Sequence, residues 1–224
     1  MSNGEQAQSA EMLALFPTLV WKTQLKPEAA GPLNDAIRAK LESMMSRHPP
    51  LEYAQSFQTS QDLHRLPEFR PLVELIQAAV GGVLDYLDAE CRSLVITGCW
   101  ANVNSPGASH RAHTHPNNFL SGVYYVQTRA GADRIVFDDP RPQSFVVSPL
   151  AHEVTLDNAA EIRMTVSDGT LILFPAWLQH RVDDNESSEN RISVAFNVMF
   201  SPEETFVSDD DGGVRVIRDP HHLV

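Results

Sequence analysis

Cysteine, basic residues and long apolar runs are scarce in this 224-residue sequence. Its two cysteines, Cys91 and Cys99, are too few for a disulfide framework or a zinc ribbon, so we expect reduced thiols in the core. Lysine and arginine total 17 against 29 acidic residues, and the net charge of −12 excludes bulk electrostatic binding to nucleic acid or anionic lipid. No apolar run reaches the length of a membrane span, and the first residues lack the basic and apolar regions of a secretory signal. We therefore expect a cytoplasmic protein.

The composition is that of a soluble globular chain, with 42% hydrophobic and 21% charged residues and a mean hydropathy of −0.23. The length fits one domain with short extensions. We expect this domain over residues 12–205, with tails at 1–11 and 206–224. Helices within 12–92 are expected to brace a β-rich region over 93–205, because helical spacing of apolar residues gives way to short β-prone runs.

The N-terminal region predicts one strand and two helices. Residues 16–23 are rich in β-forming side chains. Asn34 caps a predicted helix that runs to Arg47 and ends before the two prolines that follow His48. A second predicted helix covers 70–91 and carries a broad apolar face, so we expect both helices to pack on a sheet.

From Ser93 onward, β-prone runs alternate with Gly, Pro, Asn and Asp, and no helical pattern recurs. We predict about eight strands, near residues 94–104, 119–127, 134–138, 144–148, 152–156, 162–166, 170–175 and 191–200. That number is enough for a double-sheet jelly roll or a barrel-like sandwich. The predicted fold class is α+β, mainly β with about two long N-terminal helices.

Three histidines form a candidate metal site. His113 and His115 lie just after a predicted strand, and Pro116 disfavours helical backbone at His115. Residues two apart in an extended chain point the same way, so both imidazoles can face one point. The alternative is a pair of solvated or hydrogen-bonded loop histidines. His180 follows the apolar strand predicted at 170–175 and is the third candidate ligand, the alternative being a structural histidine.

A candidate anion site follows the third histidine. Arg191, Ser193, Ala195 and Asn197 share one face of the last predicted strand. On the inward face of a β-roll a guanidinium needs an anionic partner, and a carboxylate suits it best. This suggests a cosubstrate that carries an acid group. The alternative is an Arg191 that pairs with an internal Asp or Glu or points outward.

Together, His113-x-His115, His180 and Arg191-x-Ser193 resemble the Fe(II)- and 2-oxoglutarate-dependent dioxygenases. Within that superfamily the chain is similar to a bacterial group of 2OG-Fe(II) oxygenases, over roughly residues 95–200. The stretches that carry this similarity are His113-Thr114-His115-Pro116, Leu120-Ser121-Gly122-Val123-Tyr124-Tyr125-Val126, Phe137-Asp138-Asp139-Pro140-Arg141 and Phe174-Pro175-Ala176-Trp177-Leu178-Gln179-His180.

The resemblance implies a helix-braced double-stranded β-helix. It also implies that His113, His115 and His180 hold Fe(II), and that Arg191 and Ser193 bind the distal carboxylate of 2-oxoglutarate. Tyr125 matches a cosubstrate-binding tyrosine of prolyl-hydroxylase-like members; Ser121 lies on the same strand face, and Tyr124 on the opposite one. The implied reaction converts 2-oxoglutarate and O2 to succinate and CO2 while an unidentified substrate is oxidised.

One position departs from the family pattern. Most members carry Asp or Glu where this sequence has His115, so the implied site has three neutral ligands. His110 is an alternative member of the ligand pair. Asp138 or Asp139 is a further candidate, either near the metal or as the group that orients a ligand histidine.

Two other classes of function compete with the oxygenase. A cupin-like metalloprotein, either a 2-oxoglutarate-independent dioxygenase or an isomerase, fits the spacing of Gly169, Pro175 and His180. Trp177 replaces a glycine of that motif, however, and Phe119 and Leu120 stand where a glutamate ligand is expected. Arg191, eleven residues after His180, favours the oxygenase. The third class is a non-catalytic binding module with structural histidines.

The primary substrate and the oligomeric state do not follow from the sequence. Polar residues expected near the mouth of the roll are either substrate contacts or solvated loop residues, namely Asn102, Asn104, Asn117, Asn118, Gln143 and Asn197. Trp100, Trp177 and Tyr124 are expected to be ordinary core aromatics.

Overall fold

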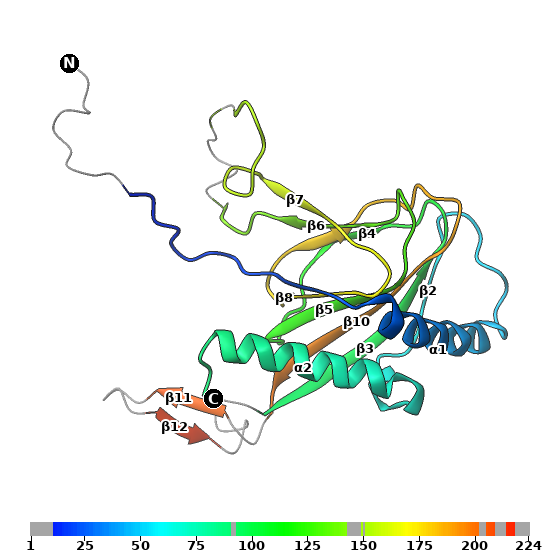
Figure 1. Cartoon of the computed structure of the whole chain (residues 1–224), viewed down its shortest axis with the longest axis horizontal. Coiled ribbons are helices and arrows are strands. Elements are labelled where there is room, and N and C mark those ends of the chain that lie inside the picture. Colours follow the sequence, from blue (N-terminus) through cyan, green and yellow to red (C-terminus); the bar gives the residue numbers. More distant parts are fainter. Residues whose placement is uncertain are drawn as a thin grey trace.

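The computed structural model describes residues 11–90, 93–142, 149, 151–201, 205–208 and 214–217, the last two segments by their backbone alone. Its helices and strands follow in the order β1 (Trp21–Gln24), α1 (Pro27–Met45), β2 (Ser56–Gln58), α2 (Arg70–Tyr86), β3 (Leu94–Asn104), β4 (His110–His113), β5 (Leu120–Gln127), β6 (Arg134–Asp138), β7 (Glu161–Thr165), β8 (Thr170–Pro175), β9 (His180–Val182), β10 (Arg191–Phe200), β11 (Thr205–Ser208) and β12 (Val214–Ile217). Short 3-10 turns at Leu63–Arg65 and Pro67–Phe69 lead into α2. The described part of the chain is mostly β, with two long helices (Figure 1).

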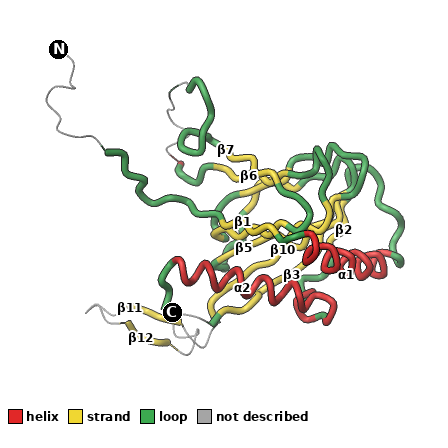
Figure 2. The backbone as a smooth tube through the Cα atoms, in the orientation of Figure 1, coloured by secondary structure: helices red, strands yellow, loops and turns green. Residues whose placement is uncertain are grey.

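The strands form two sheets and a hairpin. The larger sheet has the order β1-β8-β5-β10-β3-β2, and the smaller one the order β4-β9-β6-β7. All pairings within both sheets are antiparallel. Strands β11 and β12 pair with each other in the region expected to be a C-terminal tail. Figure 2 shows both helices along one side of the larger sheet, while β6 and β7 lie on its other side.

The helices cover the larger sheet with apolar side chains. Ile37 and Leu41 of α1, together with Leu72 and Ile76 of α2, are at most 1% exposed. They share one cluster with outward-facing side chains of the sheet, including Val194. Full burial of such an aliphatic side chain contributes about 1.5–3 kcal/mol each, so this layer holds the helices on the sheet.

Helix α1 begins earlier than the sequence predicts, and the expected cap at Asn34 is wrong. The helix begins at Pro27, a residue whose fixed φ suits the first helical position, with Lys26 as the capping residue. Asn34 is instead buried inside the helix, where its Oδ1 accepts a hydrogen bond from the Tyr124 hydroxyl at 2.8 Å. A tertiary partner therefore explains this polar residue better than a helix terminus does.

Helix α2 starts where predicted and ends at Tyr86 rather than at residue 91. Asp88 has a left-handed backbone with φ of 51°, and the Ala89 amide donates back to the Leu84 carbonyl at 3.0 Å. This C-terminal capping motif ends the helix, although apolar residues continue beyond it in the sequence.

The predicted strands at 94–104, 134–138, 170–175 and 191–200 coincide with β3, β6, β8 and β10. The strand predicted at 152–156 is wrong, because Thr155 and Asn158 close a local turn: the Thr155 amide donates to Asn158 Oδ1 at 2.7 Å. The strand predicted at 144–148 lies outside the described residues. Strand β1 is shorter than the strand predicted at 16–23. Strands β2, β4 and β9 are not predicted, because they are too short to show apolar alternation in the sequence.

Single residues test further expectations about the core. Cys99 is a free, fully buried thiol as expected, and burial raises its pKa to about 12. Cys91 lies outside the described residues. Trp100 and Tyr124 are buried, but Trp177 is 57% exposed, so its assignment to the core is wrong. None of the described helices is long and apolar enough to span a bilayer.

Candidate metal centre

Paired backbone segments bring the three predicted histidines together. His113 is the last residue of β4 and His180 the first of β9, and the two are direct partners in the antiparallel ladder. His115 follows two residues after β4, and its amide donates to the Ala176 carbonyl at 2.9 Å. The ladder and this loop contact fix all three backbones on one side of the smaller sheet.

The imidazoles converge as metal ligands do. One ring nitrogen from each of His113, His115 and His180 lies within 4.8 Å of the other two. The ring centroids are 4.4 Å apart for His113 and His180, 5.0 Å for His113 and His115, and 5.2 Å for His115 and His180. Among the described residues this is the one group of three or more His, Cys, Asp or Glu side chains that meets this condition.

Backbone carbonyls fix the orientation of two of these rings. The Nδ1 atom of His113 lies 2.7 Å from the Arg111 carbonyl, and that of His180 lies 3.0 Å from the Leu178 carbonyl. A carbonyl oxygen only accepts, so each Nδ1 carries the proton and donates it. Nε2 is therefore the nitrogen of each ring that is left to bind a metal.

Burial keeps His115 and His180 uncharged, the form in which an imidazole binds a cation. It lowers the pKa of His115 and of His180 to about 4, so both are neutral at pH 7. Three imidazole nitrogens suit Fe(II) and other divalent transition metals. The donor set therefore fits the metal that the sequence resemblance implies.

The two aspartates considered as metal or supporting groups are held elsewhere. Asp138 accepts hydrogen bonds from Gln179 at 2.8 Å and from Arg181 at 2.5 Å. Asp139 forms an ion pair with Arg141 at 2.8 Å. Neither carboxylate belongs to the group of converging ligand atoms.

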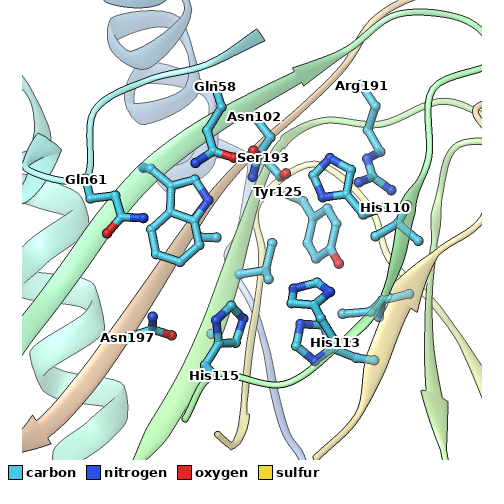
Figure 3. Close-up of a pocket in the computed structure, with 17 residues that line it drawn as sticks. Gln58, Gln61, Asn102, His110, His113, His115, Tyr125, Arg191, Ser193 and Asn197 are labelled. Carbon is cyan, nitrogen blue, oxygen red and sulfur yellow. The ribbon is translucent and has the colours of Figure 1, made fainter. Parts of the chain in front are cut away.

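A cavity of about 280 Å³ opens between the two sheets beside the histidines. Figure 3 draws the seventeen residues that line it. They come from both sheets and the adjoining loops, namely Gln58, Gln61, Trp100, Asn102, His110, His113, His115, Gly122, Val123, Tyr125, Ile135, His180, Val182, Arg191, Ser193, Ala195 and Asn197.

Arg191 supplies the cationic end of this cavity. Its side chain is 3% exposed, and no ion pair among the described residues includes it. Its Nε atom has no hydrogen-bond partner within the described ranges, and burial lowers the pKa of the guanidinium. A buried cation without a carboxylate partner is costly unless an anion binds it. Of the alternatives considered for Arg191, an internal carboxylate is not found in the described part of the chain.

Two of the other predicted cosubstrate residues share the cavity with Arg191. Ser193 lies two residues along β10 and pairs directly with Tyr125 of β5. Burial raises the pKa of Tyr125 to about 12, which keeps its phenol protonated as a donor. Ser121 does not line the cavity; its hydroxyl donates to Asn197 Oδ1 at 2.7 Å. Ser121 therefore adjoins the cavity through Asn197, its partner in the ladder.

The expected rim residues separate into three groups. Asn102 and Asn197 line the cavity, whereas Asn104 is buried behind His110. Asn117 and Asn118 belong to the loop between β4 and β5, and Asn118 is bonded to Thr97 and Pro116 rather than to the cavity. Gln143 lies outside the described residues.

Sequence reasoning missed two polar cavity residues, Gln58 and Gln61. Gln58 is the last residue of β2, a three-residue edge strand, and pairs with Asn102 of β3. Gln61 follows three residues later. No periodic signal marks so short a strand. Only its pairing with β3 shows that these amides reach the cavity.

Comparison with known proteins agrees with this geometry. Residues 98–197 match the sequence model of a family described as "Putative 2OG-Fe(II) oxygenase". No curated protein matches the sequence. HygX from Streptomyces hygroscopicus, crystallised with nickel and 2-oxoglutarate, superposes with a TM-score of 0.58 at 12% identity, over 90% of this chain and 92% of that one.

Two further solved structures share the fold. The non-heme alpha-ketoglutarate-dependent epimerase SnoN from nogalamycin biosynthesis has a TM-score of 0.58 at 10% identity, over 91% of this chain and 87% of that one. A Pseudomonas putida prolyl-4-hydroxylase has a TM-score of 0.55 at 13% identity, over 82% of this chain and 94% of that one. The three histidines and Arg191 all lie within residues 98–197, the stretch that matches the 2OG-Fe(II) oxygenase family model.

Proposed function

We propose that this protein is an oxygenase that uses Fe(II), 2-oxoglutarate and O2 to oxidise a small or macromolecular substrate. One observation carries the proposal: three convergent histidines line a single cavity with a buried arginine that has no carboxylate partner among the described residues. Two solved relatives of this fold, HygX and SnoN, were crystallised with a metal and this cosubstrate. We further propose that the two sheets form a double-stranded β-helix within one domain over residues 12–205.

His113, His115 and His180 would hold the metal. Fe(II) with 2-oxoglutarate supplies the oxidising chemistry, in which O2 is consumed, succinate and CO2 are released and the substrate is oxidised. The carbonyls that hold His113 and His180 keep two lone pairs aimed at one point without help from a carboxylate ligand. Three neutral ligands leave the full divalent charge to attract an anion.

The cavity complements a dianion at both ends. A divalent metal beside the histidines and the guanidinium of Arg191 are two cationic centres, and 2-oxoglutarate carries a carboxylate for each. Ser193 and the protonated phenol of Tyr125 are donors next to Arg191. These neutral donors add hydrogen bonds without adding further buried charge.

The other half of the cavity is the proposed place of the primary substrate. Figure 3 shows Gln58, Gln61 and Asn197 on the side away from Arg191 and His110. Trp100 lines the same cavity, with its ring centroid 5.9 Å from that of His115. Carboxamides and an indole can bind and orient an uncharged group near the metal and exclude water from it.

Binding of 2-oxoglutarate to the nickel-loaded protein tests the proposal without turnover. Nickel replaces Fe(II) because it does not require exclusion of air. Titration calorimetry should show 2-oxoglutarate binding that depends on nickel. The variant Arg191→Ala should raise the Kd about 30-fold or more, since loss of one partner of a buried charge pair costs about 2 kcal/mol or more. The control Arg134→Ala removes an arginine that is half-exposed and outside the cavity.

The same titrations separate the competing functions. Nickel binding without 2-oxoglutarate binding would favour a cupin-like metalloprotein. Absence of stoichiometric metal binding would favour a binding module with structural histidines. An unchanged Kd in Arg191→Ala would remove the proposed carboxylate site.

A further inference from the structure

His110 lies at the cationic end of the cavity and has no role in the function proposed above, which uses His113, His115 and His180 for the metal and Arg191 for the carboxylate. It is the first residue of β4, is half-buried and lines the cavity (Figure 3). Burial, with the nearby charge of Arg191, lowers its pKa to about 4. His110 is therefore an uncharged side chain next to a buried cation.

A buried amide determines which nitrogen of His110 carries the proton. Asn104 is 1% exposed, and its Nδ2 lies 2.7 Å from Ser56 Oγ and 2.8 Å from His110 Nε2. In this orientation of the amide, whose Oδ1 has no hydrogen-bond partner among the described residues, the nitrogen donates and Nε2 of His110 accepts. The proton of the neutral ring is consequently on Nδ1. No hydrogen bond between described residues engages that Nδ1.

This arrangement separates His110 from the metal ligands. His110 is not a member of the converging group, and Asn104 occupies its Nε2 lone pair. The remaining polar atom is an N–H donor beside a guanidinium. Two donors with no acceptor between them suit a carboxylate.

We propose that His110, held by Asn104, donates a hydrogen bond through Nδ1 to the same distal carboxylate that Arg191 binds. His110 thereby makes the site select a 2-oxo diacid over a 2-oxo acid with a single carboxylate. A neutral donor serves this purpose because Arg191 already balances the charge of the carboxylate, and a second buried cation would lack a partner. The inference rests on the proposed use of 2-oxoglutarate.

Two acids and two variants test this role. Nickel-loaded protein is titrated with 2-oxoglutarate and with 2-oxobutyrate, which keeps the 2-oxo acid group and lacks the distal carboxylate. His110→Leu should raise the Kd for 2-oxoglutarate about tenfold, the effect of one hydrogen bond to a charged group, and leave 2-oxobutyrate and nickel binding unchanged. His110→Asn places an amide N–H near the position of Nδ1 and should recover most of the lost affinity.

The outcomes distinguish this inference from the proposed function. If the wild-type protein binds no 2-oxoglutarate, the function itself fails. If Arg191→Ala weakens 2-oxoglutarate binding and His110→Leu does not, the function stands and the role of His110 is wrong. If His110→Leu weakens both acids or nickel equally, His110 supports the metal site or the fold instead, and the inference is also overturned.

Discussion

The two faces of the larger sheet differ sharply, and Tyr124 and Tyr125 mark the difference. These neighbours on β5 point to opposite sides of the sheet. Tyr124 joins the apolar cluster under the helices, where its hydroxyl bonds to Asn34, whereas Tyr125 lines the cavity beside Arg191. Strand β10 repeats the contrast, since Val194 belongs to the same apolar cluster and Ser193 lines the cavity.

Along β5 and β10, strand alternation therefore separates the helix-facing core from the cavity, while Ile172 and Phe174 of β8 belong to a second apolar cluster on the inner face. The outer face is filled by helical side chains, and its free energy comes from apolar burial. The inner face leaves about 280 Å³ unfilled and buries a guanidinium that pairs with no carboxylate in the described part of the chain. Ligand binding offsets that cost, because a ligand that binds only the folded state stabilises it. Register shifts flank the cavity-lining stretch from Ser193 to Asn197, and Arg191 lies before the first of them.

The strongest test of this contrast places one amide on either face of β10. Val194 is fully buried in the outer layer, so Val194→Asn should lower the free energy of unfolding by about 3–5 kcal/mol, the sum of lost apolar burial and an unsatisfied amide. Ala195 lines the cavity, and Ala195→Asn should change stability by less than about 1 kcal/mol. Urea unfolding of both variants measures the difference.

The same pair has a second readout. Ala195→Asn fills part of the cavity and should weaken 2-oxoglutarate binding, whereas any folded Val194→Asn protein should bind as the wild type does. Equal losses of stability in the two variants would show that the inner face is packed as tightly as the outer face, and the contrast would fail.

Loss of the candidate metal ligand His180, on the opposite wall of the cavity, is expected to have a smaller effect in free energy, and this effect is on nickel binding. His180→Ala should reduce nickel affinity more than about 100-fold, since even residues that only support metal ligands account for 10–100-fold. The control is His152→Ala, which removes an exposed histidine outside the cavity. Calorimetric titration with nickel measures both. Retention of wild-type nickel affinity in His180→Ala would show that His113, His115 and His180 are not the metal site.

The sequence predicts the inner face better than the boundaries of the helices. Strands 94–104 and 191–200 have the predicted ends because apolar alternation and flanking turn residues mark them locally. Asn34 has the right residue type for a helix cap, and only the distant Tyr124 hydroxyl explains its burial in the helix interior. The turn at 155–159 interrupts a run with β propensity because local side-chain hydrogen bonds compete with strand pairing.

The residues of the candidate site are likewise predictable only where the signal is local in the sequence. His113 and His115 converge because their spacing in extended chain is a local property, and His180 follows shortly after the predicted strand at 170–175. The contribution of Gln58 depends on the pairing of a three-residue edge strand, which no local pattern encodes. The hydrogen bond between Asn104 and His110 likewise arises from tertiary placement of β2, β3 and β4.

The smallest predicted effects return to the tyrosine pair and require two measurements on each variant. Tyr124→Phe leaves the buried Asn34 Oδ1 without its donor and should cost about 1–2 kcal/mol in the free energy of unfolding, with 2-oxoglutarate binding unchanged. Tyr125→Phe should raise the Kd for 2-oxoglutarate about fivefold, the effect of one neutral hydrogen bond, with little change in stability. Because one hydroxyl is removed in each case, any difference comes from the face on which it lies. If Tyr125→Phe loses stability and keeps its affinity, the inner face serves the fold rather than the ligand.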